Sequence, residues 1–169
     1  RGSGSVKKAH SINVTIPAGI DNDQRIRLRG QGEVSEPGGT PGDLYVLVRV
    51  KEHPLFKREG EHVIVDVPIT FSQAALGADI EVPSIQGALK LEIKSGTQSG
   101  ETYRLRGKGM KRLNGSGHGD QFIRVSVEVP KHLTSKQKEL LRQFEKEEKP
   151  DAHPGVTSFL KKFKDIIRT

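Results

Sequence analysis

Apolar and polar residues alternate along most of the chain, and the alternation predicts short β-strands joined by turns. Isoleucine and valine occupy every second position between residues 10 and 16, as in a strand with one buried face. Residues 25–29 alternate in the same way, and the turn-forming residues 21–23 stand between the two runs. We therefore expect residues 10–16 and 25–29 to pair as a hairpin.

The next apolar run, residues 44–50, differs because both of its faces carry apolar groups. Tyr45 and Leu47 add apolar side chains to the face opposite the regular alternation. A strand of this kind is either fully buried or lines a groove. Further strands are predicted over residues 63–69, 80–82 and 89–93. Between the first two of these, Ser72 is expected to cap a short helix that Gly77 ends in a left-handed conformation.

One stretch of the chain occurs twice. Residues 26–32, IRLRGQG, return seventy-seven positions later as residues 103–109, YRLRGKG. The same offset carries residues 16–50 onto residues 93–127 without a gap, with glycines and apolar positions in phase. We expect an all-β fold of two tandem modules, residues 1–60 and 61–130, followed by a helical tail, residues 131–169.

The offset also predicts an incomplete first module. The strand and short helix that open the second module, shifted back by seventy-seven positions, would precede Arg1. We therefore expect the first module to lack its opening strands, which leaves a sheet edge without its usual partner.

The tail carries helix signals instead of alternation. Thr134 and Gln137 have capping-box spacing, and Leu140, Leu141 and Phe144 share one face of the helix that follows. After a predicted linker at residues 149–155, Ser158 is expected to cap a last amphipathic helix, whose apolar stripe consists of Phe159, Leu160, Phe163, Ile166 and Ile167. So short a helix needs a surface to dock on, and a protein surface is favoured over a membrane.

Composition narrows the possible functions. The chain has 28 Lys and Arg residues against 21 Asp and Glu, a net charge of +7, but its aromatic residues are not interleaved with basic ones as a base-stacking surface requires. It has no cysteine, its six histidines have no metal-ligand spacing, and no nucleophile motif is present. The sequence thus predicts a binding protein without enzymatic activity, and without a signal peptide or membrane-spanning run we expect it in the cytoplasm.

Several segments together resemble the C-terminal substrate-binding region of bacterial DnaJ-type co-chaperones. They are IPAGID at 16–21, RGQGE at 29–33, PGDLYV at 41–46, HPLFKR at 53–58, AALG at 74–77, RGKGM at 106–110 and GD at 119–120. The resemblance covers the whole chain. It implies two twisted barrel-like or sandwich-like β-modules in series that capture non-native polypeptides and deliver them to a DnaK-type chaperone.

The resemblance also implies two interaction sites. By matching position, the client groove of the family places Ile12 and Val46 in an apolar pocket on the first module, with Val14, Leu28 and Leu47 as neighbours. The alternative, ordinary core packing, is favoured for Val14 and Leu28. The family dimerises through its tail, which gives the stripe of Phe159, Leu160, Phe163, Ile166 and Ile167 a homodimer contact, with docking on the second module of the same chain as the alternative.

Two parts of the family are missing from this sequence. It contains neither the His-Pro-Asp of a J domain nor a cysteine zinc repeat, although residues 1–4, RGSG, resemble the end of such a repeat. We therefore expect a fragment of a longer co-chaperone whose zinc lies N-terminal to Arg1, with no cofactor in this part. Two other functions stay open, a basic β-barrel that binds nucleic acid and a purely structural dimerisation module.

Overall fold

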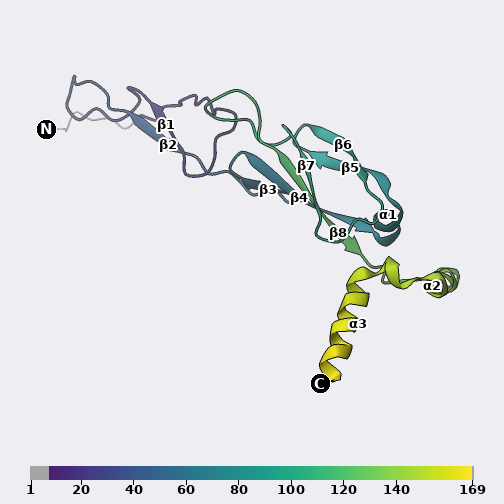
Figure 1. Ribbon diagram of the computed structural model, residues 1–169. Coiled ribbons are helices and arrows are strands. Elements are labelled where there is room, and N and C mark those ends of the chain that lie inside the picture. The colour runs from purple at the N-terminus through teal and green to yellow at the C-terminus, as the bar shows by residue number, and fades with distance from the viewer. Residues whose placement is uncertain (1–7, 169) are drawn as a thin grey trace. The chain divides into compact units, whose positions relative to one another are not determined.

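The computed structural model describes residues 8–168 and consists mainly of β-strands with a few helices (Figure 1). This confirms the predicted all-β class. The chain divides into two compact units, one that ends at Glu128 and one that begins at Val129. All strands lie in the first unit and the two long helices lie in the second. The finer division of the first unit at residue 60 stays a prediction.

The first repeat copy forms a two-stranded antiparallel ribbon. β1 (Arg25–Leu28) pairs with β2 (Leu44–Leu47), with Ile26 opposite Val46 and Leu28 opposite Leu44. The predicted hairpin between residues 10–16 and 25–29 is therefore wrong, and residues 10–16 form no strand.

The second copy shows which strand pairs with the equivalent of residues 10–16. β6 (Gly87–Ile93), which includes the offset equivalents of residues 10–16, pairs with β5 (Ala78–Ser84) and not with the equivalent of β1. Shifted back by the offset, β5 falls on residues 1–7, outside the described part of the chain. Alternation alone predicts a strand, but a strand forms only where a neighbour supplies the hydrogen bonds.

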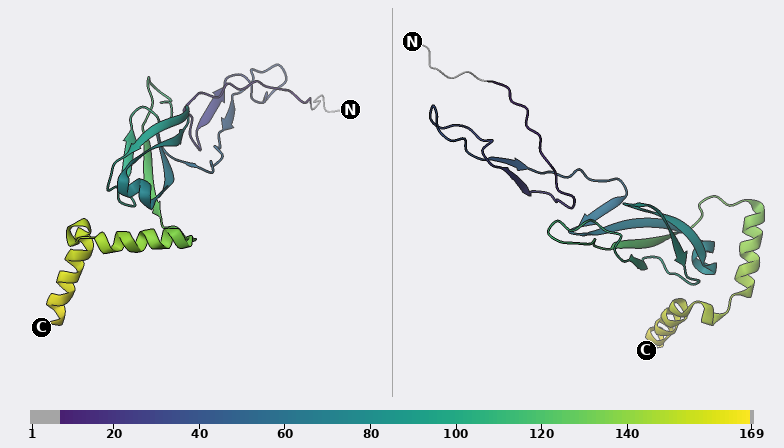
Figure 2. Two further views of the ribbon diagram at one scale, coloured as in Figure 1. Left: turned by 90° about the vertical axis from the view of Figure 1, so that its right-hand side faces the viewer. Right: turned by 90° about the horizontal axis from the view of Figure 1, so that it is seen from above.

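The second copy contributes two strands to a four-stranded sheet of the order β3, β4, β8, β7. β3 (Phe56–Glu59) and β7 (Thr102–Leu105) run antiparallel to their neighbours, whereas β4 (His62–Thr70) and β8 (Gln121–Glu128) pair in parallel from Val63 to Thr70. Strand β3 was not predicted, because its sequence, FKRE, contains a single apolar residue and therefore shows no alternation. Figure 2 shows this sheet and the separate β5–β6 pair from two further sides.

The hydrophobic core belongs to the second copy and the strands around it. Its nine buried apolar residues come from β4, β5, β6, β8 and the helix α1: Val63, Val65, Ile69, Ala74, Val82, Leu91, Ile93, Ile123 and Val125. Every second residue of β4 and β8 points into it, as the alternation predicts. Among the described residues, the first copy contributes none of these buried side chains.

Helix α1 (Phe71–Leu76) differs in its caps from the prediction. Thr70, not Ser72, is the N-cap, because its hydroxyl accepts from the Gln73 N–H at 3.2 Å while the Gln73 side chain accepts from the Thr70 N–H at 3.0 Å. Gly77 ends the helix with φ 80° and ψ 154°, a positive φ that suits glycine but is not the predicted left-handed helical conformation.

In the second unit, α2 (Ser135–Glu147) begins with the predicted capping box of Thr134 and Gln137. The predicted linker does connect the two helices, but it contains a short 3-10 helix, η1 (Pro150–Ala152), and ends before Pro154. The predicted Ser158 cap is wrong, because α3 (Pro154–Ile167) begins at its proline. Proline suits a first helical turn because its φ is preset and its missing N–H would have no intrahelical partner there. None of the described helices is long and apolar enough to cross a membrane.

Candidate polypeptide-binding surface

A carboxylate ties together the strands of each repeat copy. Asp43 follows a glycine before β2 and accepts hydrogen bonds from Arg27 Nε on β1, at 2.6 Å, and from the Gly30 N–H, at 3.0 Å. Asp120 takes the same place before β8, with Arg104 Nε at 2.7 Å and the Gly107 N–H at 2.9 Å. The repeated Arg-x-x-Gly and Gly-Asp motifs thus build one local structure at both places.

These contacts set the protonation of both carboxyl groups. The backbone hydrogen bond from Gly30, followed by the one from Arg27, lowers the pKa of Asp43 below its ordinary value. Gly107 and then Arg104 lower the pKa of Asp120 in the same way. Both groups are therefore held ionised as structural anchors, and neither is poised as an acid or base for catalysis.

The two copies differ in how their last strand is paired. β8 lies between β4 and β7, whereas β2 pairs only with β1 among the described residues. The Val48 N–H donates to the Gln24 carbonyl at 2.8 Å, so the even-numbered positions of β2 direct their backbone groups toward β1. The backbone groups of Tyr45 and Leu47 then face the open edge, where a further strand could bind.

The structure separates the five predicted groove residues into three groups. Val46 and Leu28 lie half-buried on one face of the β1–β2 ribbon. Leu47 lies on the opposite face and is 48% exposed. Ile12 and Val14 are half-buried in the extended segment that precedes the ribbon.

The offset shows what some of these positions do in the second copy. Val14 corresponds to Leu91 and Val46 to Ile123, which is fully buried in the core. The same positions are only half-covered in the first copy. The first copy therefore leaves apolar area uncovered that the second copy buries within its own fold.

Tyr45 was not among the five predicted groove residues, and its side chain is 56% exposed beside the open edge of β2. The sequence does hold a signal for a role of Tyr45, because residues 44–50 carry apolar side chains on both faces of the strand. Because Tyr45 and Leu47 are exposed, this strand is not fully buried in the described structure. Of the two alternatives for a strand with two apolar faces, lining a groove is the one that remains.

A cavity of about 820 Å³ lies beside β3 and was also not predicted. Apolar walls come from Phe56, Val63 and Met110, and charged groups such as Lys51 and Glu52 also line it. Arg58, another lining residue, donates to the backbone carbonyls of Ile20 at 2.7 Å and Gly19 at 2.8 Å. These bonds join the turn after residue 16 to strand β3.

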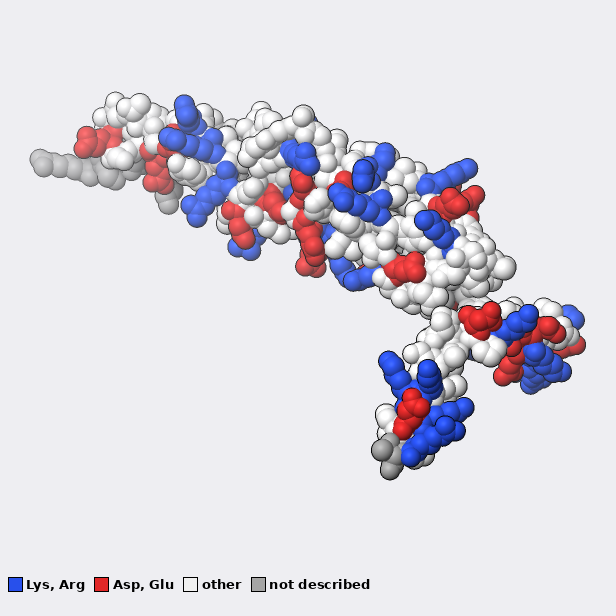
Figure 3. All heavy atoms as spheres, in the orientation of Figure 1, with Lys and Arg blue, Asp and Glu red and all other residues white. Residues whose placement is uncertain are grey.

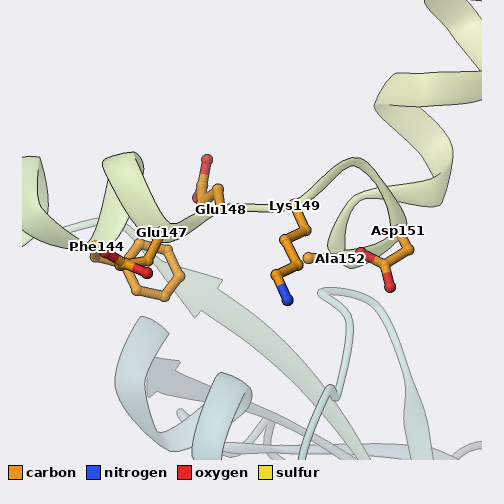
Figure 4. Close-up of a pocket in the computed structure, with 6 residues that line it drawn as sticks. All are labelled: Phe144, Glu147, Glu148, Lys149, Asp151 and Ala152. Atoms are coloured by element: carbon orange, nitrogen blue, oxygen red, sulfur yellow. The ribbon is translucent and has the colours of Figure 1, made fainter.

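The tail leaves its predicted dimerisation stripe uncovered. Its exposed fractions run from 47% to 74% for the five residues Phe159, Leu160, Phe163, Ile166 and Ile167. Phe159 and Phe163 stack with ring centroids 6.3 Å apart. A shallow hollow of about 280 Å³ lies where α2 meets η1, lined by Phe144, Glu147, Glu148, Lys149, Asp151 and Ala152 (Figure 4). The second unit thus carries apolar side chains that its own two helices do not bury.

Comparison with known proteins agrees with this architecture. The model of the DnaJ C terminal domain matches residues 4–130, and that of the chaperone protein DnaJ C-terminal region matches residues 136–168. The chain belongs to the DnaJ family. The DnaJ C terminal domain thus includes both copies of the repeat, and the DnaJ C-terminal region includes nearly all of α2 and α3.

Individual DnaJ relatives are similar over most of the chain. A chaperone protein DnaJ of Bacillus cytotoxicus is 54% identical over 150 residues, and one of Bacillus mycoides is 55% identical over 150 residues. Each alignment covers 89% of this chain but only 41% of the relative. The chain therefore spans about two fifths of the length of these DnaJ proteins, whose name supports a chaperone role.

Proposed function

We propose that this chain binds non-native polypeptides as extended segments on the first repeat copy. The observation that carries the proposal is the open edge of β2, whose equivalent β8 is paired on both sides. Main-chain hydrogen bonds to an edge are independent of client sequence, which suits a protein that must bind many different segments.

The apolar side chains around the edge support the same proposal. Val46 and Leu28 on one face of the ribbon, with Ile12 and Val14 in the preceding segment, are half-covered and offer apolar area to a client side chain. Leu47 lies on the other face and acts through its backbone as well as its side chain. Burial of one leucine-sized client side chain would contribute about 1.5–3 kcal/mol.

Two further steps extend this proposal to the assembled chaperone. The exposed stripe of α3 joins two copies of the chain, so that two client sites act on one unfolded polypeptide and raise its overall affinity without a new contact. The captured segment then passes to a DnaK-type chaperone. No step proposed for this chain depends on a bound metal.

The edge is tested by a proline substitution. Leu47→Pro removes an N–H that faces the open edge and leaves the β1 ladder intact, whereas Leu47→Ala removes the side chain and keeps the N–H. We expect reduced and alkylated ribonuclease A, a permanently unfolded basic protein, to bind the proline variant about tenfold more weakly than the alanine variant.

Fluorescence anisotropy of the labelled, unfolded ribonuclease measures both affinities, and circular dichroism checks that both variants keep the wild-type spectrum. Equal binding by the two folded variants would exclude strand addition at this edge.

A further inference from the structure

The face of the β1–β2 ribbon opposite Val46 has an unusual composition. In the register of the ribbon, Arg25 lies opposite Leu47 and Arg27 lies opposite Tyr45. Arg29 lies in the turn that follows β1, and Arg49 continues the alternation after β2. We call this surface the arginine face; its members are Arg25, Arg27, Arg29, Tyr45, Leu47 and Arg49.

The positive charge of the arginine face is largely unpaired. Arg27 forms an ion pair with Asp43. Arg25, Arg29 and Arg49 are exposed, and within residues 8–168 they form no ion pair. Figure 3 shows Lys and Arg side chains over the region where Figure 1 labels β1 and β2, with Asp and Glu side chains beside them. An anionic partner would therefore meet three guanidinium groups, those of Arg25, Arg29 and Arg49, that are not engaged in ion pairs among the described residues.

The equivalent face of the second copy carries less unpaired charge, although Arg106, at the position of Arg29, is exposed there as well. Arg124, at the position of Leu47, forms an ion pair with Asp66 of β4 at 2.6 Å. Arg104 is paired with Asp120 and also lies 5.9 Å from the centroid of the Phe122 ring. At the positions of Arg25 and Arg49 the second copy has Thr102 and Ser126. The first copy thus gains two arginines and a leucine where the second is neutral or internally paired.

We propose that the arginine face binds an extended acidic polypeptide segment that also carries apolar residues. Side chains two positions apart on a strand are separated by roughly 6.8 Å, so carboxylates on every second residue of an extended segment match the spacing of Arg25 and Arg27 on β1. Guanidinium groups bind carboxylates through paired hydrogen bonds. Tyr45 and Leu47, both about half-exposed, receive an apolar side chain of the same segment.

Nucleic acid fits this face less well than an acidic polypeptide does. Single-stranded nucleic acid is held by successive bases that stack on several aromatic rings, and Tyr45 is the one aromatic residue among the six members of the face. Leucine offers no stacking surface, whereas it contributes apolar contact to a peptide. The site shares Tyr45 and Leu47 with the proposed client edge, but its charged contacts come from arginine side chains that the client site does not use.

The test uses the labelled peptide GELELELG and fluorescence anisotropy on the full 169-residue chain. We expect saturable binding that weakens with added salt, and about tenfold weaker binding by the double variant Arg25→Gln with Arg49→Gln, since the variant removes two exposed guanidinium groups that pair with the peptide carboxylates. Arg106→Gln, at the equivalent of Arg29 in the second copy, is the matched control and leaves affinity unchanged. The peptide GKLKLKLG binds more weakly than GELELELG.

Three results would overturn the proposal: no binding of GELELELG, equal binding by the double variant and the wild type, or tighter binding of an oligothymidylate that the double variant loses. The last result would assign the face to nucleic acid. Unfolded ribonuclease, which is basic, separates this site from the client site. The double variant should retain its affinity for that protein even where it loses the acidic peptide.

Discussion

At the scale of single residues, the same carboxylate anchor occurs in both repeat copies with different burial. The side chain of Asp120 is 12% exposed and that of Asp43 is 24% exposed, although both accept from an arginine and a glycine N–H. Water and salt screen a more buried ion pair less strongly. The pair of Asp120 with Arg104 should therefore contribute more to stability than the pair of Asp43 with Arg27.

We therefore expect Asp120→Asn to lower the melting temperature at neutral pH by more than Asp43→Asn does. The amide of asparagine keeps a hydrogen-bond acceptor for Gly107 and loses the ion pair with Arg104. Differential scanning calorimetry of the two variants measures the difference. A larger loss for Asp43→Asn would show that burial does not rank the two anchors.

The lowered pKa of Asp120 also predicts an acid dependence. Its ordinary pKa is 3.8, and in the folded chain the pKa is lower, so the unfolded chain binds the proton at a higher pH. The stability that this carboxylate contributes is thus complete above about pH 4 and is lost as the pH falls through the folded pKa. Free energies of unfolding from urea titrations below pH 4 should decline less steeply for Asp120→Asn than for the wild type.

Two glycines at equivalent positions of the repeat share a backbone conformation but differ in how closely they are packed. Gly19 and Gly96 both have positive φ, of 88° and 81°. An added Cβ at Gly19 would overlap the Lys111 carbonyl oxygen and lie 3.1 Å from the Leu113 nitrogen, whereas one at Gly96 meets nothing within 4 Å. Sequence comparison alone treats the two as identical.

We expect Gly19→Ala to cost roughly 1–3 kcal/mol more than Gly96→Ala, because both variants pay the backbone penalty and only the first forces a main-chain overlap. Urea unfolding of both variants gives the difference in free energy of unfolding. Equal costs would mean that the turn at Gly19 does not pack on residues 111–113.

At the scale of elements, the alternation of apolar and polar residues predicts where most strands lie but not which strands pair. β4, β5, β6 and β8 fall where apolar residues alternate, because a strand with one buried face has period two. The parallel pairing of β4 with β8 has no local signal, since the two strands are far apart in the sequence. Residues 10–16 carry the same pattern as β6 and form no strand, because pairing depends on a neighbour that the pattern does not contain.

Only part of the candidate polypeptide-binding surface could be predicted from the sequence. The resemblance to DnaJ proteins placed Val46 and Leu47 in a client groove, which stays a prediction; among the described residues β2 pairs with β1 alone. The arginine face could not be found from residue type alone. It depends on the register that places Arg25 opposite Leu47 and on the ion pairs formed on the equivalent face of the second copy.

At the scale of the whole molecule, the exposed stripe of α3 predicts self-association. We expect light scattering to give twice the chain mass of 18.6 kDa, and the single chain mass for the double variant Phe159→Asp with Phe163→Asp. Charged residues oppose burial of the stripe in a dimer interface. Lys161→Ala with Lys164→Ala, on the basic side of the same helix, is the matched control and should remain a dimer.

A monomeric wild type at all concentrations would contradict the two-site arrangement, and client capture would then rest on one site per particle. A dimer that persists in the Phe159→Asp, Phe163→Asp variant would move the interface away from α3.

Amide hydrogen exchange tests the central claim most directly, because it reports on the backbone groups at the open edge of β2. The chain is compared with and without an excess of reduced and alkylated ribonuclease A. Strand addition predicts slower exchange of the Tyr45 and Leu47 amides, while the Val46 and Val48 amides, which already face β1, change little. Slower exchange confined to β8, β5 or β6, with Tyr45 and Leu47 unchanged, would contradict client binding at the first copy.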